Sequence, residues 1–136
     1  MEKYPSGWTT FAAFSCPHCP LQNEESIDWA LHHIGKVKPD VTIHLGDGHE
    51  ADSASRWPSE ADWSLEHEFN QHNKLLRRVR KASKASRLVM LPGNHDANLM
   101  SLNRINAKLR SLCDYRRREP ELVHWEHNRE YIYERN

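Results

Sequence analysis

Three short apolar runs, each followed at once by a polar cluster, constrain the fold of this chain more than any other feature. The runs cover residues 8–14, 41–45 and 87–91, and each has the length of a buried strand. The longer segments between them carry apolar residues at helical spacing. Because strands alternate with helices, the sequence predicts an α/β fold with a mostly parallel sheet flanked by helices.

The longer segments predict three helices. Residues 24–37 place Ile27, Leu31 and Ile34 on one face, and Pro39 is expected to end this helix. A second helix is expected over about 60–83 and a third over about 98–112, with a weak strand candidate at 131–133.

Composition indicates the size of the fold and its surroundings. With 136 residues, 38% of them hydrophobic, the chain is long enough for one domain with a modest core. Its mean hydropathy of -0.88 indicates that this core is thin or is completed elsewhere. Three cysteines are too few for a disulfide scaffold, and no run approaches the ~18–20 apolar residues of a membrane span. We therefore expect a cytoplasmic protein.

Each apolar run ends in residues that can bind metal ions. The clusters are Ser-Cys-Pro-His-Cys at 15–19, Gly-Asp-Gly-His-Glu at 46–50 and Gly-Asn-His-Asp at 93–96. Carboxylate, imidazole and amide oxygen suit manganese, iron or zinc, and together they can form a two-metal site. Because the ends of parallel strands lie side by side, one edge of the sheet is expected to bring these clusters together. The residues expected to meet there are Cys16, His18, Asp47 and Asn94.

These clusters carry a resemblance to a known family. The clusters at 46–50 and 93–96 resemble the second and third motifs of calcineurin-like metallophosphoesterases. The cluster at 15–19 is similar to the first motif, Asp-x-His, with Cys16 in place of the aspartate. The resemblance covers roughly residues 9–100, the amino-terminal part of the family. The form His-Cys-Pro at 18–20 and the stretch at 50–57 are similar to phage and prophage members. It implies the first half of an α/β/β/α sandwich and, for a phage protein, the host cytoplasm.

The resemblance also implies a role for each matched residue. His18 would bind the first ion, Asp47 would bridge both ions, and Asn94 would bind the second. His95 would face the substrate and protonate the leaving oxygen, while Asp96 would orient His95 through its other ring nitrogen. Two divalent ions (manganese, iron or zinc) would activate water and clamp the phosphate oxygens. The implied function is a metal-dependent phosphoester hydrolase, phosphodiesterase or nuclease-like.

Two departures from the family pattern leave the activity open. Cys16 is either a substituted ligand, which as a thiolate favours zinc over manganese, or a small buried residue. Family members also continue with Gly-His and Gly-His-x-His motifs, whereas the forty residues after Asp96 hold only His124 and His127, at another spacing. We therefore expect residues 1–136 to form a single, incomplete domain. It is either a truncated hydrolase or an inactive remnant that acts as a binding or assembly protein.

Several other residues allow more than one interpretation. Glu50 is expected to support Asp47 by a hydrogen bond, and His49 to contact substrate or stabilise a turn. The pair Cys16 and Cys19 also allows half of a zinc site or a redox pair. His44 is expected in the core or beneath the site. The remaining histidines with a predicted place are His32, His33, His67 and His72, which we expect on helices and not as ligands.

Charge is distributed unevenly along the chain, although the net charge is zero. Residues 1–71 carry a balance of -8, residues 72–118 carry +11, and the last eighteen residues carry -3. The basic middle segment either guides a polyanion such as nucleic acid or forms a solvated helix face. No stacking aromatic residues interleave with it, which weakens the nucleic-acid interpretation. The oligomeric state stays open.

An incomplete sandwich has a consequence for the sheet. The face that would pack on a second sheet should be apolar and exposed. Its candidate residues are Phe11, Ala13, Ile43, Leu45, Val89 and Leu91.

Overall fold

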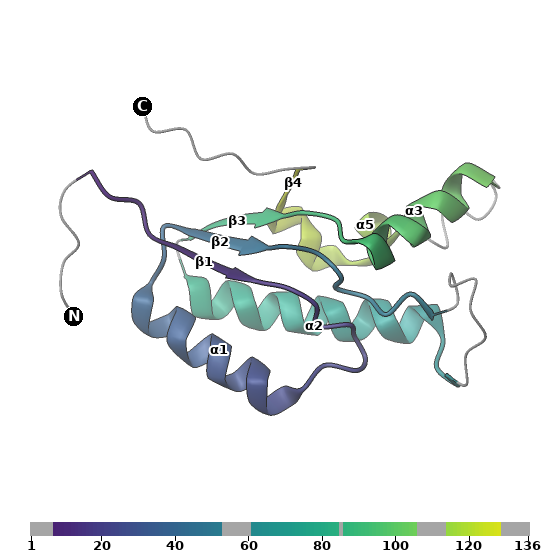
Figure 1. Cartoon of the computed structure of the whole chain (residues 1–136), viewed down its shortest axis with the longest axis horizontal. Coiled ribbons are helices and arrows are strands. Elements are labelled where there is room, and N and C mark those ends of the chain that lie inside the picture. Colours follow the sequence, from purple (N-terminus) through teal and green to yellow (C-terminus); the bar gives the residue numbers. More distant parts are fainter. Residues whose placement is uncertain (1–6, 53–60, 85, 106–113, 129–136) are drawn as a thin grey trace.

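A computed structural model describes residues 7–52, 61–84, 86–105 and 114–128 of the chain (Figure 1). The elements, in chain order, are β1 (Phe11–Phe14), α1 (Glu24–Val37), β2 (Val41–His44), α2 (Leu65–Ser83), β3 (Arg87–Met90), α3 (Asn94–Ile105), α5 (Tyr115–Arg118), the 3-10 helix η2 (Pro120–His124) and β4 (Glu126–His127). Within these residues, every helix falls short of what a bilayer crossing requires in length and apolarity.

The strands form one parallel sheet in the order β1-β2-β3-β4. The predicted α/β class and the three predicted strands are confirmed, each strand being somewhat shorter than its apolar run. The two-residue strand β4 is not predicted by the sequence. The strand candidate at 131–133 lies outside the described residues.

Local signals set the ends of the helices. The side chain of Asn23 caps α1 by accepting from Ser26 N at 2.8 Å, and Lys38 ends it in a left-handed conformation, so the predicted bounds of 24–37 are confirmed. Ser64 caps α2 in the same way, so this helix begins at 65 rather than near 60. Helix α3 begins at Asn94, earlier than predicted, because polar residues of the third cluster form its first turn.

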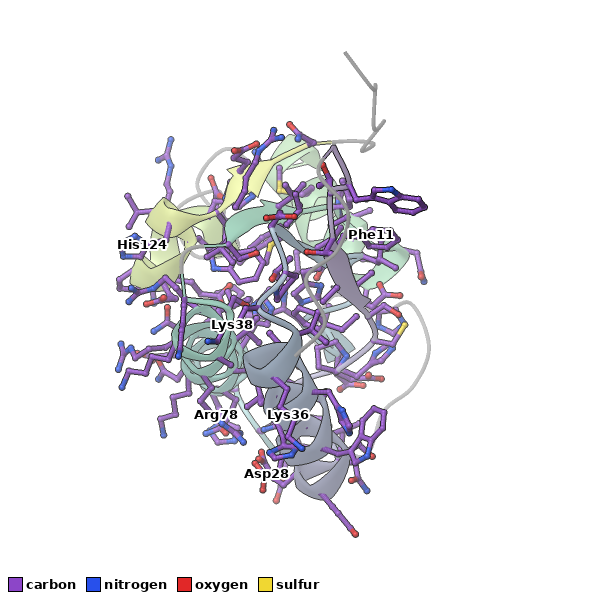
Figure 2. The ribbon with its side chains drawn as sticks, turned by 90° about the vertical axis from the view of Figure 1, so that its left-hand side faces the viewer. Phe11, Asp28, Lys36, Lys38, Arg78 and His124 are labelled. Carbon is purple, nitrogen blue, oxygen red and sulfur yellow. The ribbon has the colours of Figure 1, made fainter. Side chains whose placement is uncertain are left out.

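Helices α1 and α2 lie on one face of the sheet, whereas α3 lies beyond the carboxyl ends of the strands (Figure 1). The core between α2 and the sheet includes Leu76, Val79, Leu88 and Met90. Arg78 of α2 also reaches α1, where it contacts Asp28 at 2.5 Å and Glu24 at 2.7 Å (Figure 2). The strands are thereby held on a helical layer.

On the opposite face, exposure follows the order of the strands. Phe11 on the edge strand β1 is 68% exposed, Ala13 is exposed, and Leu45 is 47% exposed, as predicted for that face. The same prediction is wrong for Ile43 and Val89, which are buried. These two residues lie on the central strands β2 and β3, where neighbouring strands flank them on both sides.

Candidate metal centre

The loops that follow β1 and β2 continue the pairing of their strands. Cys16 N donates to Gly46 O at 3.1 Å, His18 N to Asp47 O at 3.0 Å, and Cys19 N to Gly48 O at 2.9 Å. This backbone pairing places the first polar cluster directly beside the second. The predicted proximity of Cys16, His18 and Asp47 therefore follows from these backbone hydrogen bonds.

Two glycines bring the loop after β3 against the loop after β2. Gly46 has a φ of +106°, and a Cβ there would lie 2.2 Å from Gly93 N. A Cβ at Gly93 would lie 2.1 Å from Asp47 Oδ1. Only glycine permits both the left-handed backbone and this close approach.

Three candidate ligands themselves have a strained backbone. Cys16, His18 and Asp47 have φ values of 56°, 46° and 55°, in the left-handed region that non-glycine residues rarely occupy. Such strain costs of order 1–3 kcal/mol per residue and persists only where the surroundings impose it. Backbone strain in three polar residues that lie close together is typical of a functional site.

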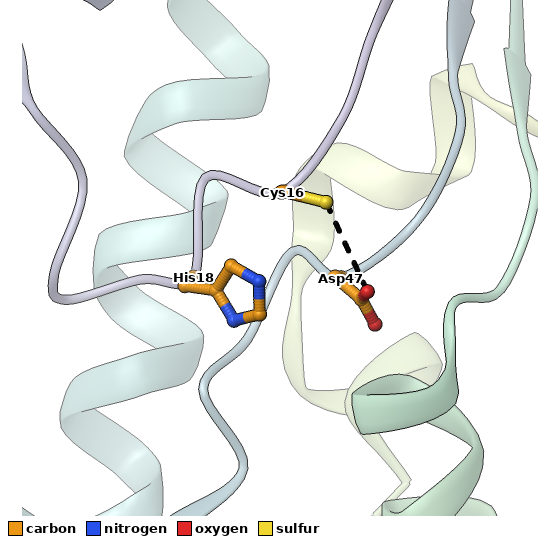
Figure 3. Close-up of side chains that lie close together, drawn as sticks. All are labelled: Cys16, His18 and Asp47. Carbon is orange, nitrogen blue, oxygen red and sulfur yellow. Dashed lines mark hydrogen bonds between the residues drawn. The ribbon is translucent and has the colours of Figure 1, made fainter.

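The carboxylate of Asp47 lies at the centre of this edge. Its Oδ1 accepts from His95 N at 2.9 Å, in the first turn of α3, where the helix dipole favours negative charge. Its Oδ2 lies 3.9 Å from Cys16 Sγ (Figure 3). One ligand atom from each of Cys16, His18 and Asp47 lies within 4.8 Å of the others.

A second group of ligands shares His18. It combines His18, Glu50 and His95, whose ligand atoms also lie within 4.8 Å of one another. His18 Nδ1 lies 2.9 Å from Glu50 Oε2, yet this nitrogen is buried and has no hydrogen-bond partner. Two electron-pair donors held together without a hydrogen bond fit a cation between them. Glu50 was expected to support Asp47; its carboxylate lies beside His18 instead, because its backbone pairs with Cys19.

Asn94 and His95 lie at the same edge. Asn94 is the exposed first residue of α3. His95 is half-buried, and its Nδ1 lies 2.5 Å from the carbonyl oxygen of Glu50, to which it donates. The expected bond from His95 to Asp96 is thus replaced by one to the backbone.

Comparison with known proteins identifies a family for this chain. The sequence profile described as calcineurin-like phosphoesterase matches residues 9–135. The chain belongs to the calcineurin-like phosphoesterase family. The match extends well past the roughly 9–100 expected from the motifs. Family membership implies divalent metal ions and phosphoester substrates. No curated protein and no solved structure matches the chain.

Beneath the metal centre, this phosphoesterase contains a buried network of imidazoles and carboxylates. We refer to His44, His49, His72, Asp96 and Glu119 as the histidine–carboxylate network, and each of them is at most 5% exposed. His49 Nδ1 bonds Asp96 Oδ1 at 3.0 Å, and His49 Nε2 bonds Glu119 Oε2 at 2.8 Å. His72 Nδ1 bonds Glu119 Oε1 at 2.7 Å, and its Nε2 lies 3.2 Å from His44 Nε2.

The positions of the protons on His44 and His72 follow from one backbone donor. Gly46 N–H donates to His44 Nδ1 at 3.0 Å, so the proton of His44 is on Nε2 and points to His72. His72 therefore accepts at Nε2 and donates from Nδ1 to Glu119. His49 faces a carboxylate at each nitrogen and donates from both.

The charges of the network agree with this assignment. Burial opposes the charged form of His49, but Glu119 and Asp96 outweigh it and raise its pKa to about 9. Burial and the neighbouring His72 hold the pKa of His44 well below its usual value. Burial would raise the pKa of Asp96 and of Glu119, but the adjacent histidines hold both below their usual values. His49 is thus an imidazolium between two carboxylates.

The network shows that the expectation for His49 is wrong. It also gives His44 and His72 hydrogen-bond partners that the sequence did not indicate. His49 is fully buried and cannot contact substrate. His44 lies beneath the site, as expected. His32, His33 and His67 are exposed, whereas His72 is buried; its place on the apolar face, between Phe69 and Leu76, is the signal that could have indicated it. Glu119 has no such signal, because it follows three exposed arginines in the sequence.

Cys19 does not fit a redox pair or a second zinc ligand. It is completely buried in the main core. Burial, reinforced by Glu119, raises the pKa of its thiol to about 12, so the thiol stays protonated at neutral pH. Cys16, by contrast, is exposed at the candidate metal centre.

Many basic residues of the middle segment have partners within the fold. Arg80 bonds Glu121, Arg78 bonds two carboxylates of α1, and Arg87 bonds Glu126 at 2.6 and 2.7 Å. These ion pairs weaken the case for a strip of free arginines that guides nucleic acid.

Proposed function

We propose that this phosphoesterase hydrolyses phosphoesters with divalent metal ions held at the carboxyl edge of its sheet. The observation that carries the proposal is the pair of overlapping ligand groups that share His18, whose buried Nδ1 has no hydrogen-bond partner. The donors are a thiol, imidazoles and carboxylates, a set that suits zinc and also accepts iron or manganese.

Each ligand has a place in this proposal. Cys16 and His18 would hold the first ion, Asp47 would bridge to the second, and Asn94 would hold the second, with Glu50 beside His18. When bound, such ions neutralise phosphate charge and lower the pKa of water. Asp47 is suited to bridging because its two oxygens have different neighbours, His95 N at Oδ1 and Cys16 Sγ at Oδ2.

His95 is the proposed general acid. Because its Nδ1 donates to the Glu50 carbonyl, Nε2 is the nitrogen that would face the leaving oxygen, and it would give a proton when both ring nitrogens are protonated. Asp96 acts through the backbone: it accepts from Asp47 N at 2.8 Å and Gly93 N at 3.0 Å, which holds the loop and the start of α3 together. Phosphodiesters, nucleic acid among them, are the proposed substrates, and the likeness to phage members stays a prediction.

A second candidate function is binding without hydrolysis. It is favoured by the late histidines: within the described part of the chain, neither His124 nor His127 joins a group of ligands. His127 Nε2 lies instead 3.4 Å from the carbonyl of Leu122.

Metal titration and hydrolysis of a bis-aryl phosphate distinguish these functions. With zinc or manganese added, Asp47→Asn should abolish metal binding. His95→Ala should keep metal binding at Cys16, His18 and Asp47 but lower hydrolysis by about 100-fold or more. His124→Ala, an exposed histidine, is the control and should leave both unchanged. Metal binding without hydrolysis would favour the second function, and hydrolysis independent of His95 would contradict the mechanism.

A further inference from the structure

Glu119 connects the carboxy-terminal part of the described chain to the loops around the metal centre. It lies between α5 and η2, is 1% exposed, and accepts one hydrogen bond at each carboxylate oxygen. One donor is His49 from the loop after β2, and the other is His72 from α2. A single buried carboxylate therefore links three separate segments.

A continuous path of hydrogen bonds leads from Glu119 to Asp47. His49 binds Glu119 with one nitrogen and Asp96 Oδ1 with the other. The second oxygen of Asp96 accepts from the backbone N–H groups of Asp47 and Gly93. The path ends at the residue whose carboxylate lies at the centre of the candidate ligands.

The polar side-chain atoms of the network are joined by hydrogen bonds. His49, His72 and Glu119 are close enough to hold an ion. However, both nitrogens of His49 and both nitrogens of His72 already have partners at 2.7–3.2 Å. The donor at Gly46 fixes the direction of the bonds through His44 and His72 to Glu119, and His49 donates to a carboxylate on each side.

We propose that Glu119 is a positioning residue of the metal centre, acting through His49 and Asp96 on the backbone of Asp47. The inference rests on the metal centre of the proposed function. Asp47 has a strained φ of 55°, which the loop keeps only if its backbone N–H is held from outside. Glu119 supplies one of the two carboxylates that hold His49, one at each ring nitrogen.

Glu119→Gln tests this role, because glutamine keeps the shape but offers one acceptor and one donor to two donating histidines. We expect metal affinity, measured by competition with a chromophoric chelator, to fall by about tenfold or more. In metal-free protein, hydrogen exchange at the amide of Asp47, whose N–H donates to Asp96, should become faster.

Glu121→Gln is the matched control. Glu121 is also buried and two residues away, but it binds Arg80 and Arg77 outside the path. This variant should lower the melting temperature and leave metal affinity and Asp47 exchange unchanged. If Glu119→Gln does not fold, Glu119→Asp keeps the charge with a shorter reach and should show an intermediate loss.

Two results would overturn the inference. One is an unchanged Asp47 exchange rate in folded Glu119→Gln, and the other is an equal loss of metal affinity in both variants. The exchange measurement needs no metal, so it separates a failure of the positioning role from a failure of the proposed function. Wild-type protein that binds no metal would contradict the proposed function and, with it, the positioning of a metal centre.

Discussion

Cys16 gives the candidate metal centre an unusual donor. A thiolate is softer than a carboxylate and binds zinc in preference to manganese. Its Sγ lies 3.9 Å from Asp47 Oδ2, and its backbone is held in place by Gly46 O. This single residue should therefore decide which metal the centre prefers.

Cys16→Asp should shift metal preference from zinc toward manganese, because it replaces the soft donor by a hard one. The ratio of the two dissociation constants measures the shift. Cobalt provides a direct check, since the wild-type protein should show a thiolate-to-cobalt charge-transfer band that Cys16→Asp and Cys16→Ser lack. A ratio equal in wild type and variant would show that Cys16 is not a ligand.

At the scale of elements, the loops after β1, β2 and β3 form the candidate centre because their backbones are in direct contact. Gly46 and Gly93 are in contact at the point where two loops meet. Gly35 is different: it lies within α1, and a Cβ there would meet only Ala82 O at 3.9 Å. The two glycines Gly46 and Gly35 therefore make a matched pair for one substitution.

Gly46→Ala should lower the free energy of unfolding by about 2 kcal/mol or more, because alanine disfavours positive φ and its Cβ would overlap Gly93. Gly35→Ala should raise it by about 0.5–1 kcal/mol, because glycine weakens a helix interior. Urea denaturation measures both values. A tolerated Gly46→Ala would mean that the loops do not touch as described.

The element scale also shows what the sequence can predict. The bounds of α1 follow from neighbouring residues, Asn23 at one end and Lys38 with Pro39 at the other. The strand ends predicted the meeting of Cys16, His18 and Asp47, because parallel pairing is a general rule. Glu119 and β4 could not be predicted in this way, since His49 is 70 positions from Glu119 and Arg87 is 39 from Glu126. Only tertiary packing brings such partners together.

At the scale of the whole molecule, the network makes stability depend on pH. Between pH 6.5 and about 9 the folded protein keeps a proton on His49 that the unfolded chain has lost. Raising the pH through this range therefore favours unfolding. Below pH 6.5 the unfolded chain binds a proton at His44 that the folded protein cannot, so acid also favours unfolding.

Metal-free protein should consequently be most stable near pH 6.5, with a loss of up to about 3 kcal/mol on the alkaline side. Urea denaturation at a series of pH values, with a chelator present, measures the profile. His49→Gln should be less stable and should lose the slope between pH 6.5 and 9. A wild-type profile that is level over that range would show that His49 is neutral in the folded protein.

The separation of Glu119 from its partners has a further consequence, for the order in which the molecule assembles. The contact between His49 and Glu119 closes a loop of about 70 residues. Closing such a loop costs chain entropy before the contacts that stabilise it can form. Contacts of this kind form late in folding. A growing chain on the ribosome already carries the first metal ligands long before residue 119 is made. We expect the ligands at residues 16–50 to bind metal weakly until the segment around Glu119 packs against them. The metal centre would then be completed last in folding.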